Sequence, residues 1–102
     1  MRAERLLTLS SAARRIADLV AAADAPLRYE VMRHLLRVSE ETMTEALEEI
    51  VAAGLVRRAE DPFTYVPRDD ALRAELREHL GDERMLRMQR QIAGASERVL
   101  GE

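Results

Sequence analysis

The sequence has no cysteine, which excludes disulfide bonds, thiolate catalysis and zinc sites built on cysteine. It has no lysine either, so all 16 basic residues are arginines, a bias that we attribute to a GC-rich bacterial genome. Aromatic residues make up only 3% of the chain, so the core must be built from aliphatic side chains. No apolar run approaches the roughly 20 residues that span a bilayer, which excludes a transmembrane helix.

Glycine is also scarce. The 4 glycines are scattered, so the chain lacks a glycine-rich loop for phosphate binding. The formal net charge of −3 argues against a general nucleic-acid binder, but it is compatible with a local basic patch. The basic N-terminus is not followed by a sustained apolar segment or a clear cleavage site, so we expect no secretory signal and a cytoplasmic protein.

What is abundant is aliphatic and charged residues. Hydrophobic residues are 47% of the chain and charged residues 34%, a composition typical of a globular protein. A length of 102 residues predicts one domain with a single modest core. Alanine, leucine, glutamate and arginine favour helix, so we expect a mostly α fold.

The first part of the sequence predicts two helices. One covers residues 6–23, with Ser10 or Ser11 able to cap a shorter version. Its buried stripe is Leu9, Ala13, Ile16 and Val20. Pro26 suits the first turn of a second helix over residues 27–37.

A third helix is predicted to begin after Ser39, a good N-cap residue. Glu40 and Glu41 in its first turn suit the helix dipole. Gly54 is placed to adopt the left-handed conformation that ends a helix. The core face is predicted to be Met43, Ala46, Leu47, Ile50 and Val51.

A small two-stranded β-hairpin is predicted next, with strands at residues 55–59 and 63–67 and a turn at 60–62. The order helix, helix, tight turn, helix and hairpin resembles the winged helix-turn-helix superfamily, most closely in ALEEIVAAGLVRR. The chain is similar to small bacterial winged-helix transcriptional regulators, with a winged-helix core at about residues 8–68 and a C-terminal helical extension at about 69–100. The alternative is a plain helical bundle with an irregular loop in place of the hairpin.

The resemblance implies sequence-specific binding of double-stranded DNA, with the third helix in the major groove and the wing against the backbone or minor groove. Carried over by position, the candidate nucleic-acid-binding residues are Thr42, Thr44, Arg28, Arg33, Arg37, Arg57, Arg58 and Arg68. The arginines could instead pair with glutamates as ordinary surface ion pairs.

The charge of the third helix departs from this pattern. It carries Glu40, Glu41, Glu45, Glu48 and Glu49 and no arginine, whereas phosphate contacts normally come from cations. A second hypothesis is therefore a winged-helix module that binds a basic protein partner through this helix. Its candidate residues are Glu41, Glu45 and Glu48.

Two C-terminal helices are predicted, over residues 71–80 with Asp69 or Asp70 as the cap, and from a cap at Asp82 to about residue 99. The last one carries a seam of Met85, Met88, Ile92, Ala95 and Val99 at three-four spacing. This seam either folds back as core or pairs with a second copy. We expect a homodimer through the first and last helices, which makes Met85, Met88, Ile92 and Val99 candidate protein-interaction residues.

The sequence contains no recognisable catalytic site. His34 and His79, the only histidines, stand in different predicted helices without metal-ligand spacing. Neighbouring carboxylates point in different directions on a helix and do not form an acid/base pair. We therefore expect no enzymatic activity, no cofactor and no metal.

Overall fold

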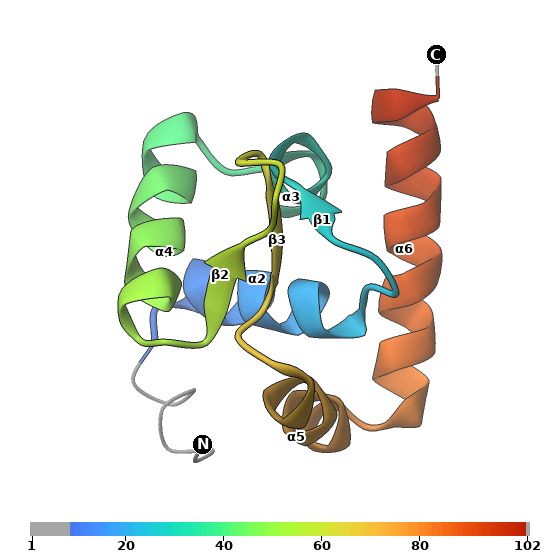
Figure 1. Cartoon of the computed structure of the whole chain (residues 1–102). Helices are drawn as coiled ribbons and strands as arrows, with labels where there is room; N and C mark the ends of the chain where they lie inside the picture. The colour runs from blue at the N-terminus through green and yellow to red at the C-terminus, as the bar shows by residue number, and fades with distance from the viewer. Residues whose placement is uncertain (1–8, 102) are drawn as a thin grey trace.

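The computed structural model describes residues 9–101, which form five helices and a three-stranded antiparallel sheet of order β1-β3-β2 (Figure 1). In chain order the elements are α2 (Ser11–Ala22), β1 (Leu27–Arg28), α3 (Tyr29–Leu36), α4 (Glu40–Ala52), β2 (Val56–Arg58), β3 (Thr64–Pro67), α5 (Asp70–Leu80) and α6 (Asp82–Leu100). The prediction of a mostly helical fold with a small hairpin is confirmed.

α2 is the central helix, with α4 on one side of it, α6 on the other and the hairpin across it (Figure 1). The predicted stripe is buried from Ala13 to Val20, and Leu9 packs partly against the same core. Ser10 is the N-cap, because its side chain accepts a hydrogen bond from the backbone N–H of Ala13 at 3.2 Å. Leu9 and Ser10 precede the helix; residues 6–8, where we predicted its start, lie outside the described residues.

The prediction that Pro26 opens a helix is wrong. The two residues after it form β1, which pairs antiparallel with β3 so that Leu27 lies opposite Tyr65. α3 therefore begins only at Tyr29. Pairing with a strand nearly forty residues later, together with the burial of Leu27, outweighs the local helix signal.

α4 begins where predicted, since the Ser39 side chain accepts from the backbone N–H of Thr42 at 3.1 Å. Gly54 follows the helix with φ of 76°, in the left-handed region that favours glycine. The predicted core face is correct except for one residue. Ile50 is fully buried, but Val51 is 45% exposed, because it lies about 100° further round the helix.

The hairpin has the predicted position with a third strand added. β2 and β3 pair antiparallel with Arg57 opposite Val66, and β1 covers the other edge of β3. Asp61 fixes the turn: its side chain accepts from the backbone N–H of Phe63 at 2.9 Å, and its carbonyl accepts from the N–H and hydroxyl of Thr64. The hairpin is therefore stabilised by β1 and by the helices that it contacts, as a short two-stranded unit must be.

Asp69 caps α5, because its side chain accepts a hydrogen bond from the backbone N–H of Leu72 at 2.8 Å. This bond, and then the hydrogen bond from Arg68, hold the pKa of the Asp69 carboxyl below its usual value.

The two C-terminal helices meet at one residue, Gly81. Asp82 was predicted to cap the last helix, but it is the first helical residue and Gly81 takes the cap position. Gly81, with φ of 86°, is both the C-cap of α5 and the residue that precedes α6. Because no other residue separates the two helices, there is no separate N-cap residue for α6.

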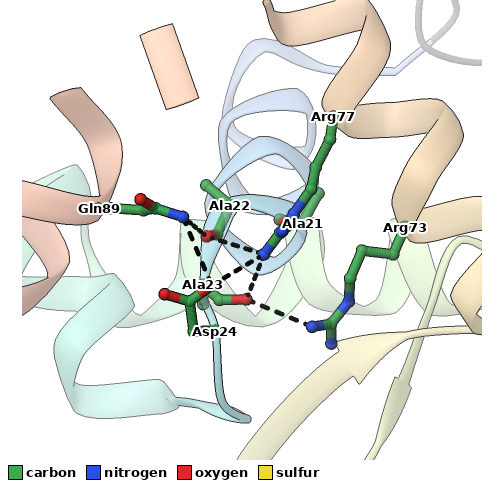
Figure 2. Close-up of polar contacts among 7 residues, drawn as sticks. All are labelled: Ala21, Ala22, Ala23, Asp24, Arg73, Arg77 and Gln89. Carbon is green, nitrogen blue, oxygen red and sulfur yellow. Dashed lines mark hydrogen bonds and ion pairs between the residues drawn. The ribbon is translucent and has the colours of Figure 1, made fainter. Parts of the chain in front are cut away.

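Side chains of α5 and α6 hold the end of α2 (Figure 2). Arg77 donates to the carbonyl oxygens of Ala21 at 2.7 Å, Ala22 at 3.3 Å and Ala23 at 3.1 Å. Gln89 donates to the Ala22 carbonyl at 3.0 Å. α2 has no basic residue in its own last turn, so Arg77 supplies the positive charge that its C-terminal dipole favours.

One carboxylate of α2 faces the C-terminal helices. The Asp18 side chain is 14% exposed and lies 3.6 Å from the guanidinium of Arg84 in α6. Burial raises the pKa of the Asp18 carboxyl, while the positive charges of Arg84, Arg14 and His79 lower it by less. The ionised form is thus a cost to the folded state that these cations only partly offset.

Across residues 9–101, no helix combines the length and the apolar character that crossing a bilayer requires.

Candidate interaction surface

The outward side of α4 is acidic. Glu41, Glu45 and Glu48 are all exposed. Within the described part of the chain none of them forms an ion pair, since the carboxylates that do so belong to other elements. This face therefore presents negative charge to whatever approaches it, and the surface ion pairs that we considered from the sequence do not involve it.

Glu49 has a different role, which sequence reasoning missed. Its Oε2 accepts a hydrogen bond from the backbone N–H of Ser10 at 2.8 Å, so it ties α4 to the start of α2. The spacing on α4 could have indicated this, because Glu49 lies about 100° from Glu48 and turns toward the helix that packs alongside. Ser10 and Glu49 line a hollow between the two helices, and Glu45 and Arg15 line it as well.

The two threonines proposed to read bases are engaged within their own helix. The Thr42 hydroxyl accepts from the Ser39 hydroxyl at 3.0 Å, as part of the N-cap. The Thr44 hydroxyl donates to the Glu40 carbonyl at 3.0 Å, one turn earlier. Local hydrogen bonds of this kind leave these side chains with less capacity to contact a partner.

The candidate arginines fall into two groups. Arg28 lies 3.2 Å from Glu30 and 3.5 Å from Asp61, and Arg68 lies 3.2 Å from Asp69, so both are neutralised by carboxylates. The other four are exposed and form no ion pair within residues 9–101: Arg33, Arg37, Arg57 and Arg58. They do not share one element, since Arg33 lies in α3, Arg37 is the residue that follows α3, and the last two lie in β2.

A groove of about 860 Å³ separates α4 from the hairpin. Apolar side chains line it: Tyr29, Leu47, Val51, Phe63 and Tyr65. Glu40 and Glu48 stand on its α4 wall, and Arg57 and Arg58 stand on its β2 wall. Sequence reasoning missed this site, because it placed Val51 in the core and treated Phe63 as an ordinary strand residue.

Arg58 is fixed at this groove by the strand register. It lies opposite Tyr65 in the β2–β3 ladder, and its Nε donates to the Tyr65 hydroxyl at 3.4 Å. This hydrogen bond raises the pKa of the Arg58 guanidinium above its usual value. Arg57 points its Nε to the Arg68 carbonyl at 3.2 Å, which holds it along the sheet edge.

The seam on α6 folds back in its middle. Ala95 is buried, and Met88 and Ile92 pack against the core formed with α2 and α3. Met85 and Val99 are half-buried. The part of the first-helix stripe from Ala13 to Val20, which was expected to meet a second copy, is inside the core. The homodimer itself stays a prediction.

Within the described part of the chain, no three side chains of His, Asp or Glu come together as a metal site would require. His34 and His79 are exposed and lie on different helices, α3 and α5.

No family model matches this chain, and no curated protein or solved structure is significantly similar to it. Its function therefore has to be inferred from the surface itself.

Proposed function

We propose that this chain is a small winged-helix regulatory protein of the bacterial cytoplasm, without enzymatic activity, that acts by binding another protein. The helices α2, α3 and α4 followed by the β2–β3 hairpin have the order of elements that the resemblance implies. The three-residue connection between α3 and α4 is as short as the turn of a helix-turn-helix, which supports this proposal.

The observation that carries the choice of a protein partner is the exposed acidic face of α4, whose carboxylates form no ion pair with any other residue in 9–101. Glu41, Glu45 and Glu48 would point toward phosphates if α4 entered the major groove, and like charges repel there. Thr42 and Thr44, the neutral residues of that helix suited to base contacts, are held by local hydrogen bonds. A basic protein surface instead complements three exposed carboxylates.

Double-stranded DNA is the second candidate, favoured by the four exposed arginines without an ion pair in residues 9–101. Arg57 and Arg58 lie on the wing, the element that contacts the DNA backbone in the resembling regulators. Arg33 lies on α3, and Arg37 is the first residue of the turn that follows it. In this alternative the arginines bind phosphates around α4 without insertion of its acidic face.

The test compares protein capture with DNA binding for the same variants. The bait is the whole chain, wild type or with Glu45→Arg and Glu48→Arg, exposed to an extract of the producing cells. A matched control carries Glu83→Arg and Glu97→Arg, which make the same charge change at exposed positions of α6. Binding to genomic DNA fragments is measured in parallel at low and at physiological salt.

We expect the wild type and the α6 control to retain a specific protein that the α4 variant loses. We also expect little binding to DNA at physiological salt. If the variant with reversed charges on α4 captures the same protein as the wild type does, the proposal is refuted. A salt-dependent DNA complex that the α4 reversal strengthens, and that Arg57→Ala with Arg58→Ala weakens, would establish the second candidate instead.

A further inference from the structure

We propose that the groove between α4 and the hairpin binds one amphipathic helix of the partner, with acidic residues along its hairpin side and basic residues along its α4 side. This inference rests on the proposed function, because it specifies which part of a protein partner is bound. Four features of the groove carry it: its exposed apolar side chains, its oppositely charged walls, the hydrogen-bonded turn that carries Phe63 and the short edge of β2.

The groove gathers exposed apolar side chains. Large hydrophobic residues that are exposed within residues 9–101 are Val51 at 45%, Phe63 at 62% and Leu86 at 52%. Val51 and Phe63 line the same groove, whereas Leu86 lies on α6 away from it. Single exposed apolar residues are common, but two on facing walls of a hollow offer a partner a continuous apolar contact.

The walls of the groove have opposite charge. Glu40 and Glu48 lie on the α4 wall, and Arg57 and Arg58 lie on the β2 wall. None of these four side chains forms an ion pair with another described residue. A nucleic acid matches one wall and is repelled by the other. A peptide with an apolar stripe and flanks of opposite sign matches both walls and the floor between them.

Phe63 is exposed and yet held in place. Its backbone N–H donates to Asp61 Oδ1 at 2.9 Å, and its carbonyl accepts from the N–H of Tyr29 at 2.9 Å. Arg28 holds Asp61 in turn, with the guanidinium 3.5 Å from the carboxylate. The backbone that presents this aromatic side chain is thus ordered before a partner binds, which lowers the entropy cost of using Phe63 as an interface anchor.

The edge of β2 favours a helix over an added strand. Leu55 with Arg68, and Ala59 with Thr64, bond inward to the ladder at 3.1 and 2.9 Å, so only Val56 and Arg58 turn backbone groups outward. Two residues are a short template for an extended peptide. The α4 wall, in contrast, presents Glu40, Thr44, Leu47, Glu48 and Val51, one face over three turns, which is the surface against which helices pack.

The probe is a fluorescent synthetic helix of about the length of α4, with leucines at i, i+3, i+4 and i+7 spacing, lysines on one flank and glutamates on the other. Two further peptides carry lysines on both flanks or glutamates on both flanks. Binding is measured by fluorescence anisotropy to the wild-type chain, to the double variant Val51→Ser with Phe63→Ser, and to Leu86→Ser. Leu86→Ser removes a similarly exposed apolar side chain outside the groove.

We expect the mixed-flank peptide to bind the wild type and Leu86→Ser equally, and the double variant about tenfold more weakly. Each single-charge peptide is expected to bind more weakly than the mixed one, because it meets a wall of its own sign. Circular dichroism of the variants confirms that they fold. Binding that is absent, that is unaffected by the double variant, or that is equal for all three peptides would overturn the inference.

These outcomes are separate from those of the proposed function. If the peptide fails while reversal of Glu45 and Glu48 still abolishes capture of a protein, then the partner binds elsewhere on α4 and the proposed function stands. If a short DNA duplex binds and the loss of Arg57 and Arg58 weakens it, both proposals fail together.

Discussion

Arg77 in α5 places its Nε 2.7 Å from the carbonyl oxygen of Ala21 in the last turn of α2, and its Nη2 bonds the two carbonyls that follow. We expect Arg77→Ala to lower the free energy of unfolding by about 2–3 kcal/mol, since hydrogen bonds to a charged donor are lost and carbonyls stay buried. Urea denaturation measures the change. Arg87→Ala, at an exposed position of α6, is the control and should stay within about 0.5 kcal/mol of wild type. Equal effects of the two substitutions would show that this contact does not attach α5 to α2.

Ile50 and Val51 are neighbours with opposite surroundings, one fully buried and the other 45% exposed. Truncation of Ile50 to alanine leaves a cavity, so we expect a loss of about 2–5 kcal/mol in unfolding free energy. Val51→Ala should cost less than about 1 kcal/mol. Thermal and urea unfolding of the pair decide which residue faces the core. A larger loss at Val51 would mean that α4 is rotated from the orientation described.

Arg37 has φ of 57° and ψ of 44°, a left-handed conformation at the end of α3. Side chains other than glycine are strained there, so we expect Arg37→Gly to stabilise the protein by about 0.5–1 kcal/mol. The same substitution at Arg33, inside α3, should destabilise it by about 1 kcal/mol, because glycine weakens a helix interior. Denaturation midpoints of both variants test this contrast, and a loss of stability in Arg37→Gly would contradict it.

Asp18→Asn should change stability in a pH-dependent way. The pKa of Asp18 is raised in the folded state above its ordinary value of 3.8, so the folded chain binds this proton more tightly than the unfolded chain does. The ionised carboxylate is therefore a cost above its folded pKa, and asparagine removes that cost. Unfolding curves should show a higher free energy of unfolding for the variant than for wild type at neutral pH. This difference should shrink as the pH falls toward 3.8. A variant that is less stable than wild type at neutral pH would indicate that the ion pair with Arg84 outweighs burial.

Asp69→Asn should show the opposite dependence. The folded-state pKa of Asp69 lies below 3.8, because the ionised carboxylate accepts from Leu72 and Arg68. Its contribution is present above 3.8 and is lost as the pH falls through the folded pKa. The variant should therefore be less stable than wild type near neutral pH, and the two should converge in acid. A constant difference at all pH values would assign the effect to cap geometry instead of charge.

Much of the fold could be predicted from local signals. Ser39, Asp69 and Gly54 act as the cap and stop residues that their types and spacing indicated. The error in the bounds of α3 arose where distant pairing decides the local structure. Leu27 follows a proline that suits a helix start, yet it joins a sheet whose partner strand is far along the chain. No local pattern contains that pairing.

The surface was less predictable than the fold. The acidic character of α4 was evident from the sequence, but the separate role of Glu49 depends on its position beside Ser10. The groove depends on how α4 is rotated against the hairpin, which decides the exposure of Val51 and the direction of Phe63. Hydrophobic periodicity identifies the residues at the centre of a buried helix face. It does not decide whether a residue at the edge of that face, within about one position, is buried or exposed.

The central position of α2 has a consequence for how the protein is made. This helix is synthesised before β3, α5 and α6, which are among the segments that cover it. During synthesis its apolar stripe therefore stays exposed to water and to chaperones until β3, α5 and α6 have emerged from the ribosome. Removal of α6, or a stalled ribosome short of it, should yield a chain that aggregates rather than a smaller folded domain.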